Sequence, residues 1–382
     1  MADAPPAGRL VEARPRAAAA PVRPSAPAPL PAARLAFLVP AGLALLTGLD
    51  AGLIRLGLPA PVRASRLPDV HGLVMVLGFV GTLVALERAI ALGRAWGYVA
   101  PGGLAAGAVL LVGPVPRAAA AAVLVVGSAA LLALYLPLWR RQAADAVLAQ
   151  ALGAALALGA CLLWAGGVPV PALLPWLAGF LVLTIAGERL ELARLSLSAG
   201  RERAVLATCA ATTVAVPCAL LWPAAGTALL GVAVLALAGG LVVCDVARRT
   251  VRGRGLPRFA AVCLLAGYGW LGVAGTSWLL AGPVTEGPGY DAVVHAVFLG
   301  FVMSMIMAHA PVILPAVLRR PLPYRPAMYV PVALLHATLA LRVGVGDAHG
   351  LTWAWQLGGV GNVVAVLTFL GVAARSSLAG PR

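Results

Sequence analysis

The segment VHGLVMVLGFVGTLVALERA, residues 70–89, decides the fold class of this chain. From Gly72 to Leu86 it contains no charged residue, and a helix needs about 20 mostly apolar residues to cross the hydrocarbon core of a bilayer. A second such segment, YDAVVHAVFLGFVMSMIMAHAPVILP, occupies residues 290–315. Both segments predict transmembrane helices, and each carries a histidine near its start.

The composition of the whole chain agrees with these two segments. Of its 382 residues, 62% are hydrophobic and 11% are charged, and the mean hydropathy is +0.96. Soluble domains contain about 25% charged residues, so this chain has too few charges to cover a water-facing surface. A soluble enzyme, a collagen-like rod and a secreted disulfide scaffold are therefore excluded.

We predict an all-α polytopic membrane protein with a single transmembrane domain, residues 34–374. Twelve apolar runs define its spans, which we place at residues 34–58, 71–92, 97–114, 116–139, 143–165, 170–193, 203–223, 225–247, 257–282, 290–318, 325–345 and 351–374. Residues 1–33 are rich in Ala, Pro and Arg and cannot bury enough apolar surface to fold, which predicts a disordered cytoplasmic tail. Residues 375–382 are predicted to form a short cytoplasmic C-terminal tail.

The arginines predict which way the spans run. All 28 basic residues are Arg, and the formal net charge is +15. They gather in alternate loops, near residues 94, 140, 201, 250 and 320, whereas the intervening loops carry few arginines and the acidic segment TEGPGYD. Because cytoplasmic loops are enriched in Arg and Lys, we expect both termini on the cytoplasmic side of a bacterial inner membrane. Charges spread over short loops predict contact with the lipid bilayer and no binding of nucleic acid.

Two of the five histidines are predicted to lie at the same depth. His71 opens the second predicted span and His295 opens the tenth, and both spans run from outside to inside. Neutral imidazole is a good axial ligand for haem iron, and two facing histidines are one way in which a helical bundle holds a haem. The alternative is that both are ordinary polar residues at the water interface.

Two further histidines lie deeper. Fourteen residues separate His295 from His309, which places His309 about 21 Å further along the same helix. His336, in the eleventh span, is predicted at a similar depth on a neighbouring helix. A second metal site between His309 and His336 is one interpretation, and a plain hydrogen-bonded polar pair is the other.

Charged residues end two of the predicted spans. Glu87 and Arg88 end the second span, and Glu188 and Arg189 belong to the group that ends the sixth. Snorkelling arginines with paired carboxylates explain these groups, and a proton relay from the cytoplasm is the alternative. Asp245 lies near a helix end and is given no role.

Short motifs in two spans resemble a known family. HGLVMVLGF, residues 71–79, resembles the HGxxM opening of the second helix in subunit I of haem-copper oxidases. HAVFLGFVMSM, residues 295–305, and LALRVG, residues 339–344, are similar to motifs of the NnrS family. NnrS proteins are haem-containing membrane relatives of that subunit, associated with bacterial responses to nitric oxide, although they tend to have a WHxHE-like segment where this chain reads DVHGLVM.

The resemblance implies a haem-copper oxidase subunit I-like bundle that binds a haem, of b type, with His71 and His295 as axial ligands. Arg342 would then lie at a suitable height to contact the haem propionates; as an isolated residue it would face the headgroups. Nitric oxide or an electron-transfer partner is the implied partner. Residues 170–223 contain no His, so the oxidase copper site is absent and we expect no oxygen-reducing terminal oxidase.

Two other classes of function remain open. A secondary transporter, for a metal among other substrates, could use Glu87, Glu188, His309 and His336 as polar waypoints, although the sequence shows no clear inverted repeat. A non-catalytic assembly partner of a respiratory complex is the third class.

Overall fold

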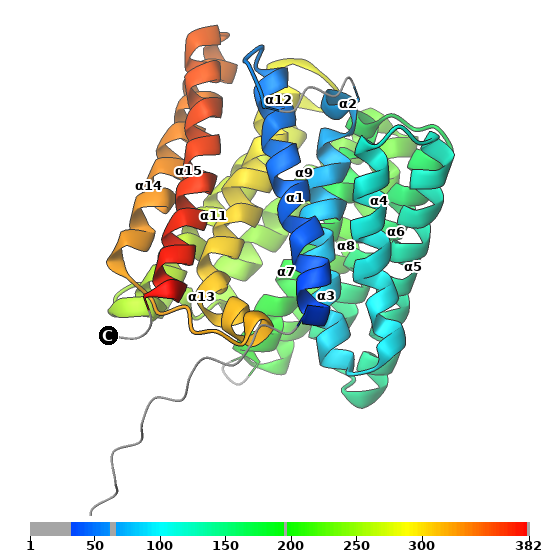
Figure 1. Ribbon diagram of the computed structural model, residues 1–382, viewed down its shortest axis with the longest axis vertical. Helices are drawn as coiled ribbons and strands as arrows, with labels where there is room; N and C mark the ends of the chain where they lie inside the picture. The colour runs from blue at the N-terminus through cyan, green and yellow to red at the C-terminus, as the bar shows by residue number, and fades with distance from the viewer. Residues whose placement is uncertain (1–31, 62–65, 195–196, 380–382) are drawn as a thin grey trace, which may run out of the picture.

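A computed structural model describes residues 32–61, 66–194 and 197–379 (Figure 1). All elements assigned in these residues are helical, and twelve of the helices are long and apolar enough to cross a membrane. The predicted class, an all-α polytopic membrane protein, is confirmed. The tail predicted for residues 1–33 lies almost wholly outside the described residues, because the first helix begins at Ala32.

The twelve spans are built from the following elements. The first six contain α1 (Ala32–Arg55), α2 (Leu67–Leu73), η1 (Val74–Gly81), α3 (Thr82–Leu92), η2 (Ala95–Tyr98), α4 (Val99–Val112), α5 (Arg117–Arg141), α6 (Asp145–Ala165), η3 (Val170–Leu173) and α7 (Leu174–Ala193). The last six contain α8 (Ala199–Leu221), α9 (Pro223–Cys244), the short α10 (Ala247–Thr250), α11 (Gly255–Ala281), α12 (Gly287–His295), η4 (Ala296–Met303), α13 (Ser304–Leu318), η5 (Pro326–Met328), α14 (Tyr329–Leu341), η6 (Arg342–Asp347) and α15 (Thr352–Leu378).

The second and tenth spans begin earlier than predicted. Their helices start at Leu67 and Gly287 with a proline in the first turn, where the fixed φ of proline favours a helix start. His71 and His295 therefore lie inside their helices, and the prediction that they open them was wrong.

The last helix runs further than predicted. It continues to Leu378, four residues into the segment that we assigned to the C-terminal tail. Ser376 is buried in this extension, where its hydroxyl donates to the Pro323 carbonyl at 2.5 Å and accepts from Arg325 Nε at 3.3 Å. These contacts with the loop before α14 hold the end of the helix in place.

Small residues let neighbouring helices approach closely. A Cβ added to Gly103 of α4 would lie 2.6 Å from the Cα of Gly127 on α5, so neither position tolerates a side chain. Such contacts are typical of membrane bundles, where close van der Waals packing holds helices together. Large apolar side chains such as Val39, Leu136 and Leu280 are exposed on the surface, as expected for a bundle surrounded by lipid.

Three helices contain wide π-helical turns. These segments are η1, η4 and η6. η1 begins three residues after His71, η4 begins directly after His295, and η6 begins at Arg342. π-Helical turns are rare and are frequent at functional sites. We call the upper end of the bundle in Figure 1, where α2 and α12 lie, the cavity end. The opposite end, near the C-terminus, is called the arginine end.

Candidate functional site

A cavity of about 1000 Å³ lies at the cavity end of the bundle. It is lined by residues from α1, α2, η1, α12, η4, η6 and α15, among others. Cofactor and ligand sites are concave spaces of about 300–1000 Å³, so this cavity is large enough for a cofactor. His71, His295 and Arg342 all line it. The structure therefore brings together the three residues that the sequence singled out for a haem site.

His71 reaches the cavity from α2. Its ring packs against α1, where a Cβ added to Gly52 would lie 3.9 Å from His71 Cε1. The Nδ1 atom of His71 is buried and has no hydrogen-bond partner within the described residues. An unpaired buried polar atom costs about 1–3 kcal/mol, so Nδ1 of His71 is an unmet hydrogen-bonding group in the wall of the cavity.

His295 reaches the same cavity from α12, and its ring is held by Asp291. Its Nδ1 lies 2.8 Å from the Asp291 carbonyl oxygen and 3.3 Å from Asp291 Oδ2. With the proton on Nδ1, the lone pair of Nε2 is directed away from these acceptors. Histidines that bind metals use this arrangement, in which one ring nitrogen donates to a carbonyl or carboxylate and the other binds the metal.

Arg342 forms the next link in this chain of contacts. Its Nε and Nη2 atoms donate to the two carboxylate oxygens of Asp291, each at 2.7 Å. The guanidinium is 8% exposed and lies 5.5 Å from the centroid of the Trp355 ring. Arg342 thus positions Asp291, and Asp291 positions His295, while Nη1 and the second N–H of Arg342 Nη2 make no bond to Asp291.

The sequence analysis missed the two carboxylates of this site. Asp291 was counted in the acidic TEGPGYD segment at the start of the tenth predicted span and was given no role. It lies one helical turn before His295, and that spacing of four residues was the available signal. Asp347 ends η6, and its Oδ2 is buried without a partner in the described part of the chain. It lines the same cavity, which gives the site a second unpaired polar atom.

Three further arginines line the cavity, and their hydrogen-bond partners are backbone carbonyl groups. Arg55 Nη1 donates to Pro68 at 3.0 Å, and Arg66 Nη1 donates to Val115 at 2.7 Å. Arg117 Nη2 donates to the Trp164 carbonyl at 2.6 Å, and its guanidinium lies 4.6 Å from the centroid of the Trp164 ring. These three partners carry no charge, but Asp69, Glu286 and Asp347 line the same cavity, so arginines and carboxylates both face it.

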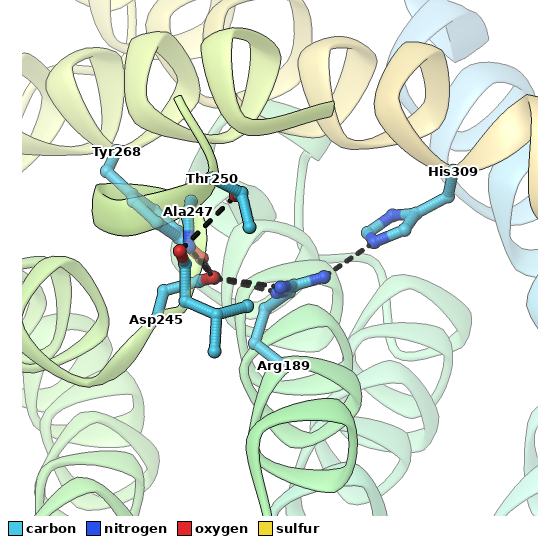
Figure 2. Close-up of polar contacts among 7 residues, drawn as sticks. Arg189, Asp245, Ala247, Thr250, Tyr268 and His309 are labelled. Atoms are coloured by element: carbon cyan, nitrogen blue, oxygen red, sulfur yellow. Dashed lines mark hydrogen bonds and ion pairs between the residues drawn. The ribbon is translucent and has the colours of Figure 1, made fainter. Parts of the chain in front are cut away.

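The structure places His309 in a different site, at the arginine end. Figure 2 shows that His309 points toward Arg189, and its Nε2 lies 2.9 Å from Arg189 Nη1. Asp245 accepts from Nε and Nη2 of Arg189 at 2.8 and 2.9 Å, from the Tyr268 hydroxyl at 2.5 Å and from the Ala247 amide at 2.8 Å. Asp245, which the sequence analysis gave no role, is therefore the centre of a buried network joining α7, α11 and α13.

His336 has its own partners. Its Nδ1 accepts from Trp270 Nε1 at 3.0 Å, and its Nε2 lies 3.4 Å from the Ser304 hydroxyl. His309 and His336 thus belong to separate clusters. Across the described residues, no group of three or more His, Cys, Asp or Glu side chains has the geometry to hold a metal ion. The second metal site remains a prediction without support from these contacts.

Taken together, the twelve apolar spans and the cavity that His71 and His295 line define a polytopic membrane protein with a partly polar cavity at one end of its bundle. Residues 34–378 match the family described as "Domain of unknown function (DUF8744)", and the chain belongs to this family. No curated protein matches the chain.

Proposed function

We propose that this protein binds a haem in the cavity between His71 and His295 and acts in the response to nitric oxide or redox stress. The observation that supports it most is that two histidines from distant spans line one cavity. The Nδ1 of His71 lacks a partner within the described residues, and the Nδ1 of His295 is held by Asp291 so that its Nε2 is available. The resemblance to NnrS suggests the stress response.

The volume of the cavity and its apolar and basic lining residues support this proposal. Apolar side chains such as Leu49, Val76 and Phe298 line the cavity and would exclude water from the tetrapyrrole. Arg55 at the mouth and the free Nη1 of Arg342 offer cations for the propionates. Asp291 fixes the ring of His295 in one tautomer. When bound, the haem would supply an iron centre for electron transfer or gas binding.

The arginine distribution supports a bacterial inner membrane as the location. In this arrangement the arginine end and both termini are cytoplasmic, and the cavity opens toward the outside. A reporter fused to the C-terminus, active only in the cytoplasm, would report on this orientation. Activity of a reporter that works only outside the cytoplasm would contradict it.

An absorption spectrum of the purified protein tests the haem site. We expect the spectrum of a six-coordinate haem with two imidazole ligands, in oxidised and reduced forms. His71→Ala and His295→Ala should each abolish this spectrum, because each removes one axial ligand. The matched control is His349→Ala, which changes an exposed histidine outside the cavity lining. A colourless, folded preparation from haem-replete cells would overturn the proposal.

A secondary transporter is the second candidate, and the wide helical turns favour it. Transporter sites form where membrane helices depart from regular α-helical geometry, and η1, η4 and η6 are three such places around the cavity. Uptake into vesicles that depends on Glu188 but not on His71 would favour transport. Uptake unaffected by Glu188→Gln would exclude this candidate.

A further inference from the structure

A second group of charged side chains lies at the arginine end, apart from the Asp245 network. Arg88 of α3 is its centre and is 12% exposed. Its Nη2 lies 2.5 Å from Glu87 Oε1, and its Nη1 donates to Gln150 Oε1 of α6 at 3.1 Å. Glu191 Oε2 of α7 lies 3.7 Å from the same Nη1. We call these residues, with Glu188 and Tyr135, the Arg88 cluster.

The Arg88 cluster contains more acidic than basic groups. Glu188 and Tyr135 both lie within electrostatic range of Arg88. The neighbouring Arg189 forms its ion pair with Asp245, so it does not compensate a second carboxylate fully. Three carboxylates, those of Glu87, Glu188 and Glu191, therefore share one nearby guanidinium. An excess carboxylate at membrane depth is costly unless it is neutralised.

Position along α7 distinguishes Glu188, whose side chain is half-buried, from the other two carboxyl groups. The side chains of Glu87 and Glu191 are 30% and 48% exposed, so water can solvate them. Glu188 lies one helical turn before Glu191 on α7, further from the helix end and nearer the middle of the span. No hydrogen bond or ion pair is found for its side chain among the described residues.

Two buried polar atoms in the cluster lack partners. The hydroxyl of Tyr135 and the Nε2 of Gln150 have no hydrogen bond in the described part of the chain, and these residues are 2% and 1% exposed. Gly187 of α7 packs closely against this part of α6, since a Cβ there would lie 2.5 Å from Gln150 Cγ and 2.6 Å from the Ala146 carbonyl oxygen. The two helices can therefore approach this closely only with glycine at this position. Both atoms are hydrogen-bond donors, so they require an acceptor within the cluster.

We propose that Glu188 is an exchangeable proton-binding site, filled from the aqueous phase at the arginine end through Glu191 and Glu87. A proton joins the Glu188 carboxylate to give the neutral carboxylic acid, and no electron moves. Its carbonyl oxygen then accepts, directly or through water, from the Tyr135 hydroxyl and Gln150 Nε2. The groups around Glu188 are Glu87 and Arg88 from α3, Tyr135 from α5, and Arg189 and Glu191 from α7. Gln150 of α6 joins the cluster through Arg88. This proposal does not depend on haem.

Infrared spectroscopy of the purified full-length protein tests the site. At neutral pH we expect the C=O stretching band of a protonated carboxyl group, which shifts in D₂O and disappears as the pH is raised. Glu188→Gln should remove this band. Glu286→Gln, which changes an exposed carboxylate at the cavity end, should leave it unchanged. A band that survives in Glu188→Gln, or its absence from the unaltered protein, would overturn the proposal.

A second variant keeps the test decisive if Glu188→Gln does not fold. Glu191→Gln removes a nearby negative charge, so the midpoint of the band should move down by about 1 pH unit. An unchanged midpoint would contradict proton binding at Glu188. Adding Na⁺ or K⁺ at constant pH should leave the band unchanged, and a loss of the band with either ion would reassign the site to a metal cation.

Discussion

The two ends of the bundle hold buried charges in opposite ways. At the arginine end, each carboxylate oxygen of Asp245 accepts two hydrogen bonds. Two of the four come from Arg189, one from the Tyr268 hydroxyl and one from the Ala247 amide (Figure 2). At the cavity end, Asp291 accepts a similar two-fold bond from Arg342, but the polar atoms beside it, His71 Nδ1 and Asp347 Oδ2, have no partner within the described residues. Similar ion pairs thus lie in different surroundings: the Arg189 pair belongs to a network whose acceptors are all used, and the Arg342 pair lies in a cavity whose lining includes polar atoms without partners among the described residues.

The largest effect should follow from breaking the closed ion pair. Asp245→Ala leaves Arg189 buried without its carboxylate and Tyr268 without its acceptor. Removing one partner of a buried ion pair costs about 3–5 kcal/mol, so the variant should unfold at a much lower temperature in detergent. Thermal unfolding followed by circular dichroism measures this loss.

The control for Asp245→Ala is Glu286→Gln, in which the changed carboxylate is exposed and forms no ion pair among the described residues. It should unfold with the unaltered protein. If Asp245→Ala were as stable as this control, the network in Figure 2 would not hold α7, α11 and α13 together.

A smaller and more specific effect should follow at the cavity end. Asp291→Ala frees the ring of His295 and leaves Arg342 without its partner. Removing a group that orients a metal-binding histidine weakens binding by about 10–100-fold, so haem should be lost from this variant by dilution or transfer to a scavenger protein. Asp69→Ala is the control, since it changes an exposed residue that also borders the cavity. Equal haem affinity of the two variants would mean that Asp291 does not contribute to haem binding.

Much of the fold could be predicted because hydropathy depends on neighbours in sequence. The twelve spans were predicted from apolar runs and from the alternation of arginines between loops. Both signals depend only on residues that are close together in the sequence. The helix starts at Leu67 and Gly287 were missed, since a proline in the first turn favours a helix start before the apolar run begins. The end at Leu378 was missed because contacts of Ser376 with a distant loop determine it.

The site was predicted only in part, for a related reason. His71 and His295 could be assigned to one depth because their spans run in the same direction, and depth is a property of a single helix. The pair of Arg342 with Asp291 joins residues 51 positions apart, and the pair of Arg189 with Asp245 joins residues 56 positions apart. Such pairs depend on which helices are adjacent, which one sequence does not specify. The same limit left Asp245 without a role.

The smallest effect on stability should come from Arg66→Gln. This variant also tests how an exposed positive charge at the cavity end affects ligand binding. Arg66 is exposed and donates to the carbonyl groups of Gly113 and Val115, so its loss should change the free energy of unfolding by only about 0.5 kcal/mol. Its positive charge has no carboxylate partner among the described residues, and we expect slower binding of an anionic ligand such as haem at low salt. Because salt screens exposed charges over about 10 Å at 0.1 M, the difference from the unaltered protein should vanish as salt is raised. Stopped-flow binding at two salt concentrations measures both rates. A rate difference that persists at high salt would mean that Arg66 shapes the mouth of the cavity, and that its charge does not act on the ligand from a distance.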